Sequence, residues 1–404
     1  MPKLSRCANG SYQRATDPWV TISPDGVAYH IAYAFDFSAP NRAMLVSRST
    51  DGGLSWGDPV ALQADTAADV SIDKETITAD PLDANYVYAV WDRLTGFDVA
   101  NNPLGTGPAW FSRTTNGGQS WEVARPIYDP GPDTQTISNQ IVVLPDTTLV
   151  NALLVITQNS SRNPRATLAV LRSTDRGVSW SQAHISVAES QFVGVNDPKS
   201  GRAIRTGSVV PNIAVDRKSG VVYIAWEDAR FSNLARDGIA LSKSLDGGLN
   251  WSAPVQVNGA PGSPAFTPAV AVAADGTLGV TYYDLRNDSP VDSGHLLVTQ
   301  WLATSTDGGA TFSDSMVAPA FDLQKAPVVE GRAYFLGDYQ GLVHDGSAFL
   351  PFFVGIAGNG PSDVFFRPAD AAAVSSGPLR VASEGVQRLW RGARERWRFG
   401  TLFK

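Results

Sequence analysis

The sequence predicts an all-β protein with four antiparallel strands in each repeat, arranged as a six-bladed β-propeller. Three observations predict this fold. A nine-residue box occurs five times, short strand-like runs flank each box, and the 37 Gly and 26 Pro residues favour turns over long helices. Self-similarity at a regular period indicates a repeat architecture. Radial repetition of four-stranded sheets produces a propeller.

The boxes recur about every 60 to 70 residues, as expected for one box in each blade. They read RSTDGGLSW (48–56), RTTNGGQSW (113–121), RSTDRGVSW (172–180), KSLDGGLNW (243–251) and TSTDGGATF (304–312). Ser and Asp side chains hydrogen-bond within their own turn, and Gly supplies the positive φ that such turns need. We expect the closing Trp or Phe to pack under the next blade. The box is therefore a folding device, not a catalytic motif.

The strands of each unit alternate apolar and polar residues, are rich in β-branched residues, and are separated by turn residues. The first unit reads WVTIS, VAYHIAYAF, AMLVSRS, the box, then PVAL; the fourth reads VPNIAVD, GVVYIAWED, GIALSKS, the box, then APVQVN. The fifth reads TPAVAVA, TLGVTYYD, HLLVTQWLATS, the box, then SMVAP. The sixth, AYFLGDYQGLV, SAFLPFFVGIA and SDVFFRPAD, has no box, as expected of a terminal repeat. Residues 1–15 form an N-terminal segment, 16–370 the propeller and 371–404 a basic C-terminal tail.

Composition excludes several classes of function. The net charge of −7 gives no electrostatic basis for binding nucleic acid. No apolar run approaches the roughly 20 residues that span a bilayer. The single cysteine, Cys7, rules out an intrachain disulfide, and the N-terminus lacks the apolar core of a secretory signal. The chain has no nucleotide-binding loop, zinc motif or serine-hydrolase elbow.

Charged residues gather at the strand ends opposite the boxes, where longer loops form one rim. The acidic residues that we place there are Asp17, Asp36, Asp73, Glu75, Asp92, Glu227, Asp228, Asp284 and Asp338, and the basic ones are Lys74, Arg93, Arg205, Arg230 and Arg286. One interpretation is salt bridging between blades. The other is a site for an anionic sugar, because planar guanidinium groups bind a carboxylate through two hydrogen bonds. Both remain open from the sequence.

The pattern S-x-D-x-G-x-[ST]-[WF] resembles the Asp box of sialidases and of the wider group of BNR-repeat propellers. It is complete in the first, third and fifth copies, while Asn116 and Asn250 replace the family residues in the second and fourth. The resemblance covers nearly the whole chain. It implies a sialidase-like six-bladed propeller.

The resemblance also implies an activity: an exo-α-sialidase-type glycoside hydrolase acting on terminal, acidic sugars. The assigned catalytic residues are Asp73, Glu227, Tyr339 and Asp338, and the assigned substrate-binding residues are Arg93, Arg205, Arg230, Arg286, Asp284 and Glu75. By this resemblance Tyr339, or Tyr334, attacks the anomeric carbon with Glu227 activating it, and Asp73, or Asp36, donates the proton. The family's first-blade Arg-Ile-Pro motif is absent: Pro18 matches its Pro, Thr16 stands at the Arg position, and Arg14 lies two residues away.

Two alternatives stay open beside the hydrolase: a non-catalytic propeller that binds glycan or protein, and a polysaccharide lyase of the same fold. The partner that we expect is a glycan or glycoconjugate, with no nucleic acid, no membrane span and a monomeric chain. We expect no required cofactor and assign no metal-ligating residue, although the rim aspartates leave Ca²⁺ as an option. The family resemblance implies a secreted or periplasmic protein.

Overall fold

The computed structural model describes residues 3–96, 105–158, 164–292, 294–329, 332–358, 360 and 362–369. It forms seven β-sheets and three short 3₁₀-helices, η1 (Arg6–Ala8), η2 (Arg230–Ser232) and η3 (Leu323–Lys325). The chain divides into two compact units. Unit 1 is residues 1–190, 217–222 and 243–252, and unit 2 is residues 191–216, 223–242 and 253–404.

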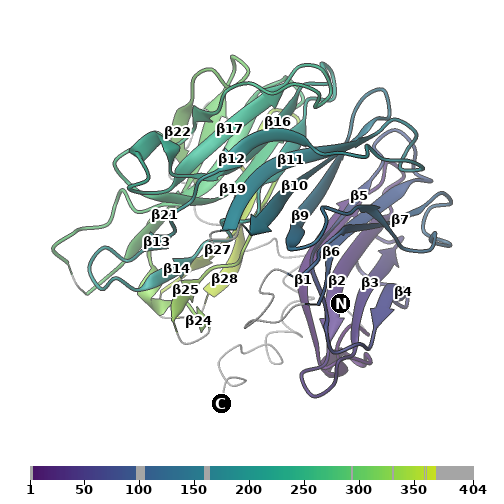
Figure 1. The fold of residues 1–404 in the computed structure, drawn as a ribbon. Helices are drawn as coiled ribbons and strands as arrows, with labels where there is room; N and C mark the ends of the chain where they lie inside the picture. The colour runs from purple at the N-terminus through teal and green to yellow at the C-terminus, as the bar shows by residue number, and fades with distance from the viewer. Residues whose placement is uncertain are drawn as a thin grey trace. The chain divides into compact units, whose positions relative to one another are not determined.

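Unit 1 contains three four-stranded antiparallel sheets, each a meander of consecutive strands (Figure 1). The first has β1 (Arg14–Ile22), β2 (Ala28–Phe35), β3 (Arg42–Ser49) and β4 (Val60–Asp65). The second has β5 (Val70–Ala79), β6 (Val87–Thr95), β7 (Ala109–Thr114) and β8 (Arg125–Tyr128). The third has β9 (Thr134–Val143), β10 (Leu149–Gln158), β11 (Pro164–Ser173) and β12 (Ile185–Ser190). These sheets correspond to the first three predicted blades.

The first strands of neighbouring sheets in unit 1 lie side by side. Thr76 and Thr78 of β5 each donate a hydroxyl hydrogen bond of 2.9 Å to a backbone carbonyl of β9. Thr21 of β1 accepts one from the backbone N–H of Ala79 in β5. The middle strands are buried on both faces because each sheet is covered by its neighbours, so they read as nearly continuous apolar runs. The outer strand β4 is largely exposed.

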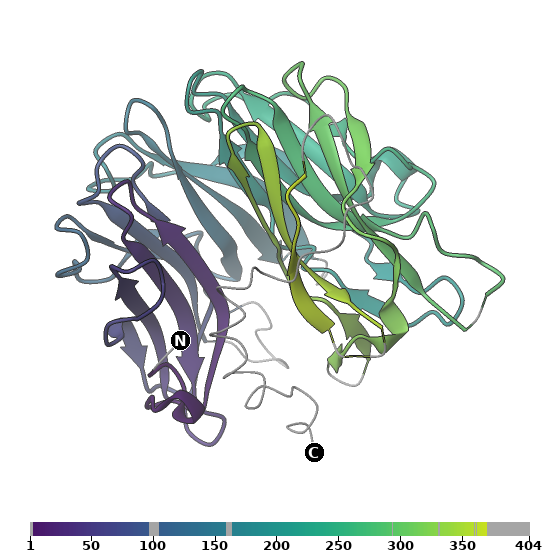
Figure 2. The ribbon, with the colours of Figure 1, turned by 180° about the vertical axis from the view of Figure 1, so that it is seen from behind.

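Unit 2 contains the other four sheets, and Figure 2 shows their strands, in green and yellow, from the side opposite to Figure 1. One meander has β15 (Asn212–Val215), β16 (Val222–Asp228), β17 (Gly238–Ser244) and β18 (Val255–Gln256). The next has β19 (Ala265–Val272), β20 (Leu278–Asp284), β21 (Leu297–Ser305) and β22 (Ser313–Met316), with β23 (Phe321–Asp322) also pairing with β21. The third has β26 (Gly341–Asp345), β27 (Ala348–Ile356) and β28 (Ser362–Phe366). A small mixed sheet joins β13 (Val195–Asn196), β14 (Ala203–Arg205), β25 (Ala333–Phe335) and β24 (Val328–Val329).

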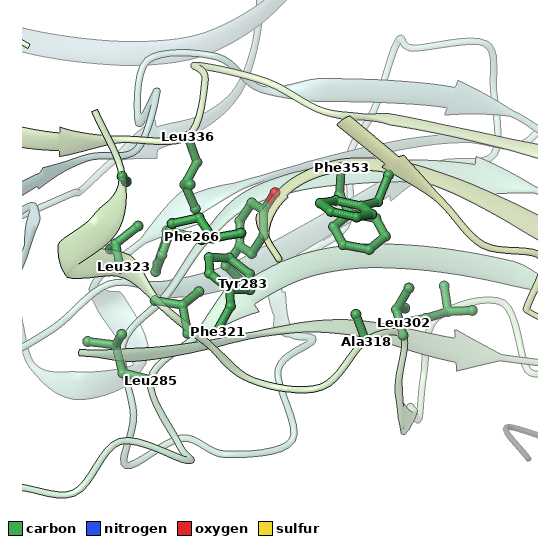
Figure 3. Close-up of a cluster of buried hydrophobic side chains, with 14 of the residues drawn as sticks. Phe266, Tyr283, Leu285, Leu302, Ala318, Phe321, Leu323, Leu336 and Phe353 are labelled. Atoms are coloured by element: carbon green, nitrogen blue, oxygen red, sulfur yellow. The ribbon is translucent and has the colours of Figure 1, made fainter. Parts of the chain in front are cut away.

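An aromatic core holds unit 2 together. Phe266 and Tyr283 pack with ring centroids 5.5 Å apart, and Phe321 meets Tyr283 edge-on (Figure 3). Leu323 and Leu336 close the same cluster. The Tyr283 hydroxyl donates to the Val354 carbonyl at 2.7 Å, so its polar end is satisfied while its ring is buried.

The box turns form the hydrogen bonds expected from their sequence. In the first box, the Ser49 hydroxyl donates to Asp51 at 2.8 Å and accepts from the Gly53 N–H at 2.9 Å. Asp51 also accepts from the N–H and hydroxyl of Ser55, and these bonds lower the pKa of Asp51 to about 2. Gly53 has a φ of 86°, which glycine adopts without strain.

The closing aromatic residue of the third box packs against the preceding blade, not under the next one as expected from the sequence. Trp180 meets Phe111 of β7 edge-on, with ring centroids 5.4 Å apart. A Cβ at Gly177 would lie 2.6 Å from the same Phe111 ring, so only glycine lets the turn approach this closely. The third box therefore fastens its blade to the one before it, whereas Trp56 of the first box lies edge-on to His30 of its own blade.

Several sequence expectations are not tested by these sheets. The sixth unit shows three strands, β26–β28, among the described residues, and closure into a six-bladed ring stays a prediction. The C-terminal tail, 371–404, and most of the long insertion after β6 lie outside the described residues. In the described part of the chain, no helix is long and apolar enough to cross a membrane.

Candidate functional site

Four of the first strands contain the same irregularity. β1, β5, β9 and β19 each shift register by a bulge, and each bulge holds a non-glycine residue with positive φ. The residues are Asp17 (51°), Lys74 (50°), Ser138 (63°) and Thr267 (51°). Bulges re-aim side chains, and strained backbone conformations cluster at functional sites. The repeated bulge therefore marks the rim where we look for chemistry.

Buried carboxylates from second strands brace two of these bulges. Asp92 of β6 accepts hydrogen bonds from the Ser138 N–H at 2.7 Å and from the Asn139 side chain at 2.6 Å. Glu227 of β16 accepts from the Thr267 N–H at 2.8 Å and from the Thr206 hydroxyl at 2.7 Å. Burial raises the pKa of both acids to about 8 despite these donated bonds. Their contacts give both side chains a structural function.

The bulges of β1 and β5 bring together three carboxyl groups and one lysine, which we call the carboxylate cluster: Asp17, Asp73, Lys74 and Glu75. The buried Lys74 ammonium lies 3.0 Å from Asp17 and 3.7 Å from Asp73. One ammonium group therefore faces carboxyl groups from both bulges, and the like charge of Asp17 disfavours ionisation of Asp73.

The two predicted acids of this cluster differ in accessibility. Burial among protein atoms raises the pKa of the Asp73 carboxyl group. The charge of Lys74 lowers this pKa, and the charge of Asp17 raises it. Even so, 41% of the Asp73 side chain is accessible to solvent. Glu75 is buried, and burial followed by the charge of Asp17 raises its pKa well above the usual value. Asp73 therefore combines a raised pKa with exposure to solvent, whereas Glu75 is shielded from solvent.

Tyr33 adjoins the carboxylate cluster from β2. Its backbone N–H donates to Glu75. Burial raises the pKa of Tyr33, and the charges of Asp73 and Glu75 add to that effect, while Arg42 opposes it. The tyrosine hydroxyl thus stays protonated beside the cluster.

All four predicted substrate-binding arginines already bind a carboxylate of the chain. The pairs are Arg93 with Asp65 (2.7 Å), Arg205 with Asp338 (2.6 Å), Arg230 with Asp228 (2.7 Å), and Arg286 with Asp284 and with Asp314 (2.8 Å to Asp314). Arg93 and Asp65 lie in different sheets, whereas Asp338 lies in the loop between β25 and β26. In AWEDAR and TYYDLR the arginine folds back onto the aspartate two residues before it, so each motif forms an ion pair within itself.

Arg205, Glu227 and Asp338 lie together in unit 2. Arg205 grips Asp338 through two hydrogen bonds, of 2.7 and 2.6 Å, and its guanidinium lies over Phe335, yet 43% of its side chain is exposed. The charge of Asp338 contributes to the raised pKa of Glu227. Tyr339 follows Asp338 and is half-buried. Asp284 is fully buried and accepts a hydrogen bond from the Trp301 indole.

The alternatives named from the sequence also have defined positions. Asp36 accepts hydrogen bonds from the Gln13 N–H at 2.8 Å and from the Asn41 side chain at 3.0 Å, and these bonds lower its pKa. Tyr334 is buried in the core of unit 2. Asp36 is thus ionised and structurally engaged, which leaves Asp73 as the better proton donor in unit 1.

The structure thus brings Asp73 and Glu75 together in unit 1, and Arg205, Glu227 and Asp338 together in unit 2. The sequence analysis placed Asp17 at the rim but assigned it no role, and it missed Tyr33. The Asp17–Pro18 and Thr267–Pro268 pairs are the one signal that could have indicated bulges, since Pro is tolerated there. Among the residues that the structure describes, no group of three or more Asp, Glu, His or Cys side chains could hold a metal ion.

Comparisons with known proteins support the fold. No family model matches the chain, and no curated protein matches it. An intramolecular trans-sialidase from Ruminococcus gnavus is 11% identical, with a TM-score of 0.55 over 91% of this chain and 96% of that one. An α-L-arabinofuranosidase from Fusarium graminearum is 13% identical, with a TM-score of 0.52 over 89% and 94%. A polysaccharide lyase, an ulvan lyase, is 10% identical, with a TM-score of 0.52 over 88% and 84%. The chain therefore has an all-β fold of four-stranded antiparallel sheets, like the propeller sialidases.

Proposed function

We propose that this protein acts on glycans and hydrolyses a terminal glycosidic bond, with Asp73 as the general acid. The observation that carries the proposal is the Asp73 carboxyl group, which is 41% exposed beside a strained bulge and lies 3.7 Å from the Lys74 ammonium that also binds Asp17. Burial and the charge of Asp17 raise its pKa. A general acid must hold its proton near neutral pH, and a neighbouring carboxylate raises its pKa for this purpose. The activities of the sialidase and arabinofuranosidase that share this fold support the same class of substrate.

The chemistry follows from the position of that proton. Asp73 donates it to the glycosidic oxygen as the bond to the anomeric carbon breaks, and an oxocarbenium-like transition state forms. The Asp73 carboxylate then takes a proton from the attacking water. Asp17 supports that proton through its negative charge, which disfavours ionisation of Asp73.

The nature of the sugar is a finer proposal. An exo-α-sialidase-type reaction on an acidic sugar needs a guanidinium group for the substrate carboxylate. Arg205 is the most exposed of the four predicted arginines, at 43% of its side chain, and a substrate carboxylate would compete with Asp338 for it. Arg205 and Tyr339 belong to unit 2, and their sequence-based assignments as substrate-binding residue and nucleophile stay predictions separate from the Asp73 mechanism. Loss of turnover in Tyr339→Phe would support the nucleophile assignment.

The test is a panel of 4-methylumbelliferyl glycosides, including the α-sialoside and the α-L-arabinofuranoside. We expect wild-type protein to release the fluorophore from one of them and Asp73→Asn to lose about 10²- to 10⁴-fold in kcat/KM. Asp58→Asn is the matched control, because Asp58 is 76% exposed and removes the same charge. Full activity of Asp73→Asn on the same glycoside would exclude it as the acid.

The second candidate is a non-catalytic glycan-binding propeller. The observation that favours it is the internal pairing of all four predicted arginines, which a purely structural rim would also show. This candidate predicts that glycans bind to wild type and Asp73→Asn equally and that no glycoside is turned over.

A further inference from the structure

Aromatic side chains extend from the carboxylate cluster along one face of β2. Tyr33 and Phe35 lie on one face of β2, and Phe37 follows two residues after the end of the strand. Phe35 stacks on Tyr33 with centroids 5.0 Å apart, and Phe37 meets Phe35 edge-on at 5.1 Å. We call these three rings the aromatic ladder. It begins where Tyr33 adjoins Asp73 and Glu75 and ends in solvent, where Phe37 is 73% exposed.

A hollow of about 570 Å³ opens at the solvent end of the ladder and is lined by Arg6, Gln13, Arg14, Phe37 and Ser38. Its walls are held in place by hydrogen bonds. The Gln13 side chain accepts from the Phe37 N–H at 2.7 Å and donates to the Ser38 hydroxyl at 3.0 Å. Arg14 lies over the Phe37 ring, 5.7 Å from its centroid. The hollow therefore combines an exposed ring with polar groups in defined positions.

The charge of this hollow is positive. Two of its lining residues are arginines, and none is acidic. The Asp36 side chain, only 5% exposed, pairs with Arg6 at 3.4 Å. Within the described residues no ion pair of Arg14 is found. A cationic hollow beside an exposed ring suits a ligand with an apolar face and an anionic group.

We propose that the aromatic ladder and this hollow bind the part of a glycan that continues beyond the bond cleaved at Asp73, and that this part carries a carboxylate or sulfate group. Sugar rings present apolar C–H faces that pack on aromatic rings, while their polar substituents take hydrogen bonds. The ladder extends over two ring-to-ring distances of about 5 Å each, so it can contact several sugars of an oligosaccharide and not one sugar alone. The protein thus acts on the end of an acidic oligosaccharide. This inference rests on the proposed function for the position of the cleaved bond.

The test uses the whole protein and an array of uronate-, sulfate- and sialate-bearing oligosaccharides with neutral counterparts, followed by calorimetric titration of the best acidic ligand. We expect Phe37→Ala to weaken its binding about five- to tenfold. Arg14→Gln should weaken acidic ligands to a similar degree, leave neutral ones unchanged, and reduce the dependence of binding on salt. Phe37 is a safe site for substitution because its backbone N–H, not its ring, makes the bond to Gln13.

Two control variants match these changes elsewhere in the chain. Phe352→Ala removes another exposed ring, and Arg202→Gln removes an arginine that lies over Tyr334 at 5.2 Å. Both should bind the ligand as wild type does. The proposal is overturned if no acidic oligosaccharide binds, or if Phe37→Ala and Arg14→Gln bind as tightly as the controls. Asp73→Asn separates the two proposals, because it should abolish turnover and keep binding.

Discussion

Replacing Asp17 with Asn should move the basic limb of the pH–rate profile toward lower pH. Asp17 supports the Asp73 proton in two ways: its negative charge repels that of ionised Asp73, and it neutralises Lys74, 3.0 Å away. In Asp17→Asn both effects disappear, and the Lys74 ammonium acts unopposed on Asp73. Each change favours the ionised form of Asp73. The acid should therefore lose its proton, and the enzyme its activity, at a lower pH than in wild type.

The substitution removes one unit charge beside Asp73, and the Lys74–Asp73 contact gives the scale of the effect of one such charge. A unit charge 3.7 Å away changes the free energy of ionisation by about 1 kcal/mol in bulk water and about 4 kcal/mol at an effective dielectric of 20. Because 41% of the Asp73 side chain is exposed, solvent screening favours the lower value. About 1 kcal/mol corresponds to a shift of just under one pH unit.

The assay is kcat/KM between pH 3 and pH 9 on whichever fluorogenic glycoside wild type hydrolyses. Asp58→Asn, which removes an exposed carboxylate of the same unit, should leave the basic limb in place. A basic limb in Asp17→Asn that stays at the wild-type pH, or moves to higher pH, would refute the role of the Asp17 charge in keeping Asp73 protonated.

The remaining predictions concern stability, measured as the free energy of unfolding in denaturant. Gly177→Ala should destabilise by about 2 to 3 kcal/mol, because its φ is 86° and the new Cβ would overlap Phe111, whereas Gly26→Ala, with a similar φ and open space around it, should lose only about 1 kcal/mol; equal losses would show that the overlap is relieved. Burial raises the folded pKa of Glu227 to about 8, so its stabilising contribution is complete below pH 4.5 and is lost as the pH rises to 8. Between pH 5 and pH 8 the free energy of unfolding should therefore fall less in Glu227→Gln than in wild type, with a difference of at most about 4 kcal/mol. Parallel curves of stability against pH for the two proteins would contradict this. Asp175→Ala removes the acceptor of its box turn and should cost about 1 kcal/mol near pH 7, allowing for its exposure, and a neutral effect would show that the turn holds without it.

The box turns are the part of the molecule that was most predictable. Ser49, Asp51 and Gly53 interact within a few residues of one another, so their hydrogen bonds follow from local spacing alone. The direction in which the box fastens the blades was wrong, because the contact of Trp180 with Phe111 joins residues about 70 positions apart. Local pattern carries no information on which neighbour a turn will meet.

The charged rim was predictable in composition and not in its pairing. The sequence analysis placed the acids and arginines at the same strand ends, and the structure then gave each arginine a specific carboxylate. Arg230 and Arg286 fold back on their own motifs, while Arg205 reaches Asp338, 133 residues away. The partner of each arginine depends on where the strand ends lie relative to one another in space, and the sequence does not give these positions.

The sequence by itself determined the repeat, the four-strand units and the turns, because these depend on residue types at fixed short spacings. Tertiary structure alone decided that the Lys74 ammonium lies between Asp17 and Asp73, and that the rings of Tyr33, Phe35 and Phe37 lead to a cationic hollow. The physical reason is that the energy of a charge pair or a ring contact depends on distances of a few ångströms. Bulges and the packing of adjacent blades set those distances, and neither follows from spacing along the chain.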